Sequence, residues 1–453
     1  MPATRKPPPE GKFAYQRIRK HFHPAAPEKL VTTSRFYPDR LKVELGRPLA
    51  ELSAEVGPEG FTGLYFPSDH EAFSALLVDS ERSAALVASA HFEEVELGRD
   101  THCPCLKNGL WLGGEGDSRF GAFYTNETDF NGESKLRLEI AVLPGEAGAR
   151  TVARLLARFD QAIREAATLR GRVLSFERES SYGYAGLKAH TLGAVAREEI
   201  ILPEATLELI DRNILRFAAQ RAALAALGLP VRKGVLLYGP PGTGKTHTIR
   251  YIASTLRNTT VLLVSSDEVK YLREYTALAR LLQPAVVVIE DVDLIAEERD
   301  GTYDPGTQGL LNRLLNEMDG LREDAEIMFI LTTNRPEVLE PALAARPGRI
   351  DQAIEIPLPD EACRRALARL YAAKMQISDD TLADITRRTK GVTASFIKEL
   401  MRRAAQSWIE AGSTGEIPGE TFIRAIEEMT LGGGRLNARL LGAGEAIGFV
   451  RAA

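Results

Sequence analysis

A glycine-rich loop that follows an apolar run is the feature that most constrains how this chain can fold. The run from Gly234 to Tyr238 has the composition of a buried strand, and a helical pattern continues from Thr246 to Leu256. Glycines between a strand and a helix let backbone N–H groups turn towards a polyphosphate, and the helix presents its positive end to the same anion. We therefore predict a phosphate-binding loop made of Gly239, Pro240, Pro241, Gly242, Thr243, Gly244, Lys245 and Thr246.

Length and composition indicate what kind of protein carries this loop. The chain has 453 residues, which favours two or three domains, and its formal net charge of −5 argues against a general nucleic-acid binder. No apolar run approaches the roughly eighteen residues that cross a bilayer, and the basic, proline-rich start lacks the apolar core of a secretory signal. We expect a soluble, cytoplasmic protein without a membrane span.

The first part of the chain has a different character from the part that carries the loop. Residues 1–35 have basic and proline residues without a period and are predicted to be a flexible basic arm. Residues 36–180 mix short strand-like runs with turn clusters and end in an amphipathic helix over 146–170, which predicts an α+β domain. Cys103 and Cys105 could form half of a metal site or have a structural role, and no downstream pair stands at ligand spacing.

The second part alternates strands and helices. A linker over residues 181–199 leads into residues 200–359, where continuous apolar strands alternate with helical patterns, as in a parallel sheet covered on both faces. Residues 360–430 contain only helical patterns and are predicted to form a small helical lid. Residues 431–453 form a tail rich in glycine and alanine, whose packing the pattern leaves open.

Polar residues follow several of these strands. The apolar run 285–289 ends in Glu290 and Asp291, and the run 327–332 leads to Asn334. Carboxyl ends of parallel strands face the ligand crevice of such a sheet, so these groups are candidates for binding Mg²⁺ and for polarising water. Arg346 and Arg349 lie on a Pro-Gly turn and are suited to reach the charge that develops in a neighbouring subunit's site.

The loop, the acid-tipped strand, LLNEMDGL at 314–321, LTTN at 331–334 and ARPGRID at 345–351 together resemble the AAA family of ATPases over roughly residues 200–430. The resemblance implies a P-loop NTPase αβα domain with a helical lid, the cofactors ATP and Mg²⁺, and a homo-oligomeric ring, usually a hexamer. By position, Thr246 and Glu290 would bind Mg²⁺ and Asp291 would activate water. Asn334 matches the polar sensor, Arg346 and Arg349 match arginine fingers, and Ala394 lies in the lid signature that contacts nucleotide.

This chain departs from the family pattern in three places. Glu290-Asp291 reverses the usual Asp-Glu order, as in the ATPase domain of the mitochondrial translocase that inserts the Rieske protein, and predicts an active but slow ATPase. Ala394 replaces the second glycine of the lid signature, and the lid lacks the sensor arginine of DNA-handling relatives. Tyr271 could be a substrate-gripping residue or simple helix packing, because no glycine follows it and its segment is short.

We expect an ATP-driven machine that remodels or unfolds a protein client, with the N-terminal α+β domain choosing that client. The alternative is a nucleotide-controlled assembly switch that recruits or releases a partner without threading it. Nucleic-acid remodelling is disfavoured by the acidic balance and the missing lid arginine, although the basic arm would be compatible with it.

Overall fold

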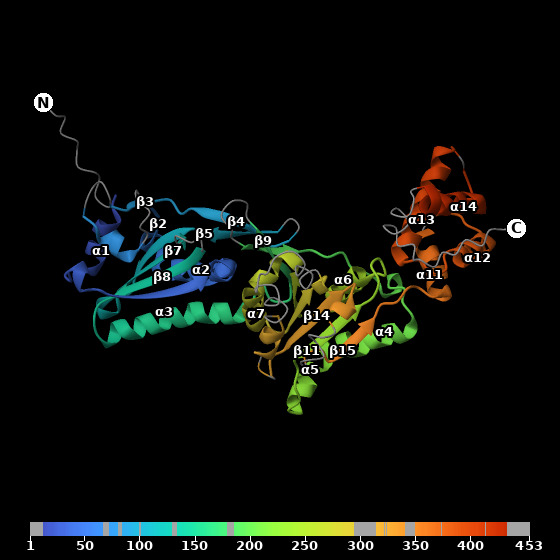
Figure 1. Ribbon diagram of the computed structural model, residues 1–453. Helices are drawn as coiled ribbons and strands as arrows, with labels where there is room; N and C mark the ends of the chain where they lie inside the picture. Colours follow the sequence, from blue (N-terminus) through green and yellow to red (C-terminus); the bar gives the residue numbers. More distant parts are fainter. Residues whose placement is uncertain are drawn as a thin grey trace, which may run out of the picture. The chain divides into compact units, whose positions relative to one another are not determined.

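The chain divides into two compact units. The computed structural model describes residues 12–66, 72–79, 84–98, 101–128, 134–178, 185–293, 314–320, 322, 324–339, 349–372, 374–412 and 414–432. The first unit comprises Met1–Arg170 and Leu174–Thr191, and the second comprises Gly171–Val173 and Leu192–Ala453. Figure 1 colours them from blue to red along the chain.

An antiparallel sheet forms the centre of the first unit. Its six strands lie in the order β1-β8-β7-β6-β2-β3. A separate two-stranded ribbon pairs β4 with β5, and β9 lies next to β10 in another sheet. The strands are β1 (Val31–Pro38), β2 (Phe61–Tyr65), β3 (Leu86–Ala88), β4 (Phe92–Glu96), β5 (His102–Leu106), β6 (Asn108–Gly113), β7 (Phe120–Thr128), β8 (Ser134–Val142), β9 (Val173–Arg178) and β10 (Ala185–His190).

Helices bury both faces of the six-stranded sheet. Alternation along β6 places Trp111 in the core under α2 (Lys42–Gly60) and α3 (Glu146–Glu165), while Leu110 belongs to the opposite core with α1 (Ala14–Phe22). The predicted α+β character of this region is therefore confirmed. The last helix ends earlier than the predicted 146–170, because Ala166 adopts a left-handed φ of 42°.

The prediction of a flexible arm over residues 1–35 is wrong from Ala14 onwards. Ala14, Ile18 and Phe22 stand four residues apart, so they share one helix face and are fully buried in the core of the first unit. Basic residues lie between them in the sequence and occupy the other face of the helix. Their number made this segment look like a charged arm, so the regular spacing of the apolar residues was overlooked. The predicted linker over 181–199 also contains regular structure, namely β10 and the 3₁₀ helix Arg197–Glu199.

The second unit contains the predicted parallel sheet. Its strands follow one another in the order β12-β13-β14-β11-β15, and all four neighbouring pairs are parallel. Their carboxyl ends therefore lie along one edge, with β11 and β13 on either side of β14. The elements are β11 (Lys233–Tyr238), β12 (Thr260–Val264), β13 (Ala285–Ile289), β14 (Ile327–Thr333) and β15 (Gln352–Glu355), with helices α4 (Glu204–Ile210), α5 (Phe217–Ala226), α6 (Lys245–Thr255) and α7 (Leu272–Leu281).

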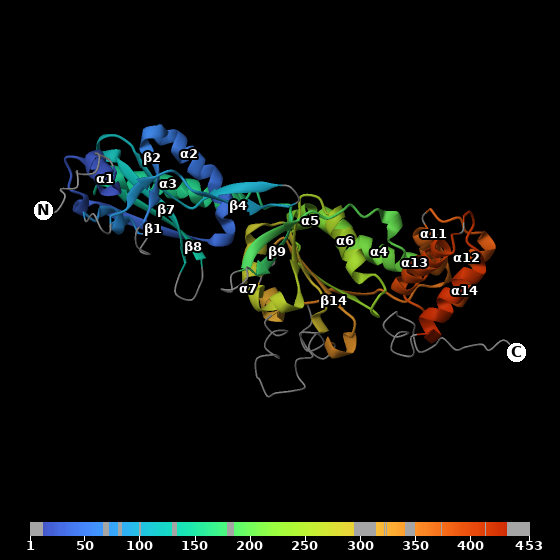
Figure 2. The same cartoon turned by 90° about the horizontal axis from the view of Figure 1, so that it is seen from above.

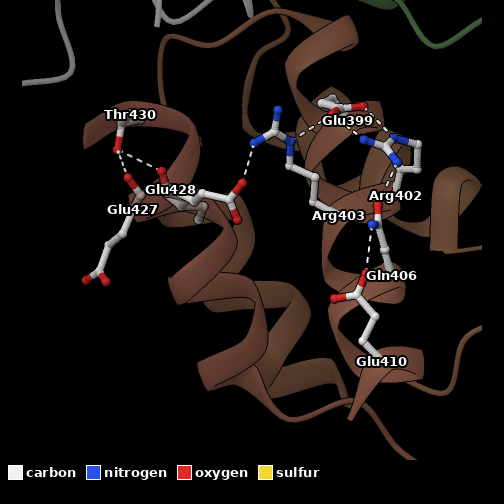
Figure 3. Close-up of polar contacts among 9 residues, drawn as sticks. Glu399, Arg402, Arg403, Gln406, Glu410, Glu427, Glu428 and Thr430 are labelled. Atoms are coloured by element: carbon white, nitrogen blue, oxygen red, sulfur yellow. Dashed lines mark hydrogen bonds and ion pairs between the residues drawn. The ribbon is translucent and has the colours of Figure 1, made fainter. Parts of the chain in front are cut away.

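Four further helices follow β15 and have a hydrophobic core of their own, as predicted for residues 360–430. They are α11 (Glu361–Ala372), α12 (Asp379–Arg388), α13 (Ala394–Glu410) and α14 (Gly419–Glu427), drawn orange to red in Figure 1. Figure 3 shows the polar network that joins α13 to the helical turn after α14. Glu399 accepts hydrogen bonds from Arg402 and Arg403, which lower its pKa to about 2, and Arg403 also contacts Glu428 at 2.8 Å.

Two other expectations concern the chain as a whole. No helix among the described stretches combines the length and the apolar composition that crossing a membrane requires. Residues 433–453, most of the predicted tail, lie outside the described residues.

Cys105 is buried in β5, where its thiol lies 3.7 Å from the carbonyl oxygen of Cys103, and burial raises the pKa of Cys105 to about 12.

Candidate functional site

The glycine-rich loop joins the carboxyl end of β11 to the first turn of α6, as predicted. Gly239, Gly242 and Gly244 have φ values of 151°, 79° and 108°, which side chains other than glycine rarely tolerate. A Cβ at Gly239 would lie 2.2 Å from the backbone oxygen of Ile356. The loop conformation therefore depends on these glycines, and it exposes backbone N–H groups at the positive end of an eleven-residue helix.

Lys245 is folded back onto the loop. Its buried ammonium donates hydrogen bonds to the carbonyl oxygens of Gly239 at 2.7 Å and Pro240 at 3.0 Å. Because an ammonium has three donors, one remains for an anion in the loop. Burial lowers the pKa of Lys245, and the nearby carboxylates of Asp291 and Asp293 act in the opposite direction.

The predicted metal-binding pair is in direct contact. The hydroxyl of Thr246 donates a hydrogen bond to Oε2 of Glu290 at 2.8 Å, although the two residues are far apart in sequence. All five residues of β13 are buried, so the strand holds the acid at its end rigidly. A hydroxyl beside a carboxylate offers the oxygen ligands that Mg²⁺ prefers.

Asp291 and Asn334 are also in direct contact. Nδ2 of Asn334 donates to Oδ1 of Asp291 at 3.1 Å, and the backbone N–H of Asp291 donates to the hydroxyl of Thr332 at 3.0 Å. Asp291 has a left-handed φ of 51°, which is uncommon for a residue with a side chain and is associated with functional sites. Two adjacent strands thus fix the carboxylate that would polarise water.

Asp293 has a positioning role that sequence reasoning did not assign to it. Its Oδ1 accepts hydrogen bonds from the hydroxyl of Thr333 at 2.8 Å and from the backbone N–H of Asn334 at 3.2 Å. Asp293 is buried, so it serves to hold the end of β14 rather than to meet a ligand. The three acids in the sequence 290–293 therefore have three different sets of hydrogen-bond partners.

These groups surround a cavity of about 640 Å³. It is lined by Pro241, Gly242, Gly244, Lys245, Thr246, Asp291 and Asn334, and also by Ala394 from the lid. The lid is joined to the loop by a hydrogen bond from the backbone N–H of Ser395 to the carbonyl oxygen of Gly242 at 3.1 Å. Lining residues that sequence reasoning missed are Glu199, His247, Arg250, Thr332, Leu370, Tyr371, Ser395 and Lys398.

The remaining predicted loop residues do not line the cavity, except for Pro241, but form hydrogen bonds within the loop. Thr243 is buried, and its hydroxyl donates to the carbonyl oxygen of Pro240 at 2.9 Å. Gly239 and Pro240 supply the carbonyl groups that hold Lys245. The donor set, the positive-φ glycines and the free helix N-terminus therefore fit a magnesium nucleotide, with Thr246 and Glu290 towards the metal and Lys245 towards the phosphates.

The two predicted arginine fingers are not part of this cavity. Arg346 lies outside the described residues. Arg349 precedes β15 at the amino end of the sheet, where Nε donates to Oδ1 of Asp319 at 2.9 Å and Nη2 donates to the other carboxylate oxygen. It lines a separate cavity of about 160 Å³. In this conformation Arg349 does not contact the chain's own phosphate loop.

Tyr271 lies at the junction between a 3₁₀ turn and α7. It is half-buried, it is the N-cap residue of α7, and the ammonium of Lys270 lies 5.1 Å from the centre of its ring. Both predicted alternatives, gripping residue and helix packing, remain compatible with this position.

Comparison with known proteins agrees with the geometry. Residues 235–358 match the family described as ATPase family associated with various cellular activities (AAA). The chain is 37% identical over 214 residues to 26S proteasome regulatory subunit 10B of Dictyostelium discoideum, covering 45% of this chain and 54% of that protein. It is 34% identical over 215 residues to the proteasome-activating nucleotidase of Methanocaldococcus jannaschii, covering 45% and 50%.

A third relative is the ATP-dependent zinc metalloprotease FtsH of Mycobacterium tuberculosis, with 34% identity over 251 residues, 52% of this chain and 32% of that protein. The chain thus spans about half the length of the first two curated relatives and less of the third. Since the match includes the loop, the acid pair and Asn334, residues 235–358 form an AAA ATPase family domain, homologous to those of the proteasome ATPases and FtsH.

Proposed function

We propose that this chain hydrolyses ATP in a ring of identical subunits and uses the hydrolysis to remodel or unfold a protein client that its first unit selects. One observation carries the proposal: the 2.8 Å contact between Thr246 and Glu290, which joins the phosphate loop to the acid-tipped strand. A glycine-rich loop alone could bind many anions. A loop joined to a carboxylate and a polar amide has the parts that cleavage of a nucleoside triphosphate needs, and this supports the proposal.

Different groups of the chain would bind the phosphates and the metal ion of the nucleotide. Backbone N–H groups of the loop and the N-terminus of α6 receive the phosphates, and the free donor of Lys245 reaches their terminal oxygens. Thr246 and Glu290 would supply oxygen ligands for Mg²⁺. When bound, Mg²⁺ neutralises charge that develops on the phosphoryl oxygens.

Hydrolysis requires a base for the attacking water. Asp291 supplies the carboxylate, and Asn334, which donates to it at 3.1 Å, holds its orientation and stands where it can contact the terminal phosphate. Asp has a shorter side chain than the glutamate usual in the family, so the water is held less closely. We expect slow turnover for this reason.

The direct test is the release of inorganic phosphate from ATP in the presence of Mg²⁺. Lys245→Ala should abolish turnover because the ammonium of Lys245 is the group aimed at the phosphates. Lys390→Ala, which removes an exposed lysine of the lid outside the cavity, is the matched control. Equal turnover by the Lys245 variant and the unmodified protein would rule out the proposed site.

Catalysis between subunits has its own test. Cation stabilisation of the transferring phosphoryl group contributes roughly 10³-fold or more in rate, so Arg346→Ala should nearly abolish turnover without loss of nucleotide binding. Mixing this variant with Lys245→Ala subunits should restore some activity, because an intact site forms at some mixed interfaces. Arg349→Ala is a less clean variant, since Arg349 also pairs with Asp319 in its own chain. A complete absence of rescue at every mixing ratio would argue against catalysis in trans.

A second candidate, the assembly switch, is favoured by the position of Tyr271. A half-buried residue that begins a helix is less available to grip a threaded chain than one on an exposed loop. Tyr271→Ala separates the candidates: a threading motor should lose client processing and keep basal hydrolysis, whereas a switch should keep partner recruitment as well.

A further inference from the structure

The first turns of α13 in the lid lie against the phosphate loop. The backbone N–H of Ser395 donates to the carbonyl oxygen of Gly242 at 3.1 Å, and Ser395 and Lys398 both line the cavity of about 640 Å³. Because the two residues stand three apart in a helix, their side chains share one face. Figure 2 shows α13 beside α11, the helix that contributes Tyr371 to the same cavity.

Lys398 stays outside the polar network of its own helix. Glu399, the next residue, accepts hydrogen bonds from Arg402 and Arg403 (Figure 3). Among the residues that the structure describes, no carboxylate pairs with the exposed side chain of Lys398 and no hydrogen bond holds it. Its ammonium lies 5.9 Å from the centre of the Tyr371 ring. Lys398 is therefore a cation of the lid that lines the cavity and is available to an anion.

The direction of the side chain brings this cation towards the loop. Long side chains in a helix lean over the turn on its N-terminal side, so Lys398 leans towards Ser395 and the loop. A distance of 5.9 Å stands at the outer limit of about 6 Å for attraction between an ammonium and a ring, so the contact with Tyr371 is weak. A phosphate oxygen offers a stronger, charge-assisted hydrogen bond. The ammonium should leave the ring when a phosphate is present.

The loop alone supplies few side-chain cations for a phosphate chain. Two of the three donors of Lys245 are taken by the carbonyl oxygens of Gly239 and Pro240. Arg250 also lines the cavity, but it stands on α6, the helix that follows the loop. A contact from Arg250 would leave the lid unconnected to the nucleotide, whereas a contact from Lys398 would connect the two.

We propose that Lys398 is a nucleotide-binding residue of the lid, which contacts the inner phosphates and holds α13 on the loop when a nucleotide is bound. The inference rests on the proposed function, which requires a nucleotide in this cavity. Backbone N–H groups of such a loop receive the α- and β-phosphates, and Ser395 contacts the middle of the loop at Gly242. ADP should therefore engage Lys398 as fully as ATP does.

Calorimetric titration of the full-length protein with ADP and Mg²⁺ measures this contact without turnover. Lys398→Met keeps the length of the side chain and removes its charge, so it should weaken ADP binding roughly fivefold or more. Lys398→Arg keeps the charge and should retain most of the affinity. Lys390→Met, at an exposed lysine of the lid outside the cavity, is the matched control. Unchanged affinity in Lys398→Met would overturn the proposal.

The response to salt separates a phosphate contact from a structural role in the lid. Potassium chloride screens the attraction between an exposed ammonium and a phosphate. The affinity of the unmodified protein for ADP should therefore fall more steeply with potassium chloride than that of Lys398→Met. Parallel salt profiles would mean that Lys398 acts through the packing of the lid, and they would overturn the proposal even if Lys398→Met binds more weakly.

Hydrogen exchange measures the connection to the lid. ADP should slow amide exchange over residues 394–400 in the unmodified protein. At ADP concentrations that saturate both proteins, the slowing should be smaller in Lys398→Met, whereas Arg250→Met should retain it. Equal slowing in the unmodified protein and in Lys398→Met would overturn the role in holding α13.

This proposal and the ATPase proposal fail in different ways. If Lys245→Ala loses ADP binding and Lys398→Met keeps it unchanged, only the assignment of Lys398 is overturned. If the unmodified protein binds no ADP, both are overturned. Lys398→Met changes an exposed side chain, so the thermal stability of the nucleotide-free protein should stay the same, and calorimetry of that form checks that the variant is folded.

Discussion

The guanidinium of Arg349 forms a two-point contact with the carboxylate of Asp319 in the same chain. The partners are unequally buried: the side chain of Arg349 is 8% exposed and that of Asp319 is 49% exposed. Nη1 of Arg349 is also buried and has no hydrogen-bond partner among the residues that the structure describes. Among the residues that the structure describes, Asp319 is the one carboxylate paired with Arg349, so the buried guanidinium depends on it for its counter-charge.

Asp319→Asn should destabilise the protein more than Arg349→Met does. The asparagine variant leaves a buried guanidinium without its counter-charge, which costs about 1–3 kcal/mol. The methionine variant removes the buried charge and leaves Asp319 half in water. Differential scanning calorimetry of the full-length variants measures the difference, and a larger loss of thermal stability in Arg349→Met than in Asp319→Asn would contradict the prediction.

Asp291→Asn should reduce ATP turnover and leave nucleotide binding intact. The amide keeps the shape of the side chain and its contact with Asn334, but it cannot accept a proton from water, and general-base catalysis contributes about 10²–10⁴-fold in rate. Phosphate release and calorimetric nucleotide titration measure the two quantities. Asp324→Asn, at an acid that is 68% exposed and pairs with Arg322, is the control. Turnover equal to that of the unmodified protein would remove Asp291 from the mechanism.

The order of the acid pair can be tested separately. The double variant Glu290→Asp with Asp291→Glu restores the usual family order and gives the base a longer reach towards water. Turnover should rise if the short side chain of Asp291 limits the rate. A fall would indicate that the 2.8 Å contact between Glu290 and Thr246 depends on the longer acid and that the order suits this site.

The parts of the site that could be predicted from sequence are those whose residues belong to one short motif. Lys245 and Thr246 follow a glycine loop, and Glu290 and Asp291 follow a buried strand, so a parallel sheet was sufficient to predict that they meet. Asp293 shows the limit of this reasoning. Its partners, Thr333 and the backbone of Asn334, lie on a different strand, and nothing in the run 290–293 indicates which acid faces inwards.

The fold was predictable where apolar residues recur with a clear period. The helical period of Ala14, Ile18 and Phe22 was obscured by the surrounding basic residues, and its burial depends on a sheet formed later in the chain. The pairing of Arg349 with Asp319 could not be foreseen, because the motif that contains Arg349 resembles one that acts on a neighbouring subunit. Cavity residues from the lid, such as Tyr371 and Lys398, required the packing of α11 and α13 against the loop.

Gly242→Ala should weaken nucleotide binding. A Cβ at this position would lie 2.3 Å from Oγ of Ser395, and the φ of 79° is strained for alanine by about 1 kcal/mol or more. Adding Ser395→Ala removes the closest contact, but it leaves the backbone strain and the tight approaches to Oγ1 of Thr393 at 3.2 Å and Cβ of residue 395 at 3.3 Å. The double variant should therefore recover only part of the affinity. Complete recovery, measured by nucleotide titration, would show that the lid contact alone restricts this glycine.

Nucleotide binding should take up protons at alkaline pH. Burial lowers the pKa of Lys245 below its ordinary value of 10.5, so the free protein loses this ammonium at a lower pH than it would lose that of an exposed lysine. A bound phosphate favours the charged form and raises the pKa again, and affinity must therefore fall as pH rises through the lowered pKa.

Titration calorimetry in buffers of different ionisation enthalpy measures this uptake directly. The uptake should grow as pH rises towards the lowered pKa of Lys245, at pH values where the nucleotide phosphates are already ionised. Lys398→Ala should retain the uptake, because Lys398 lines the same cavity but its side chain is exposed. Binding without proton uptake over this range would mean that Lys245 stays charged in the free loop, held by the carbonyl oxygens of Gly239 and Pro240 and by the nearby acids.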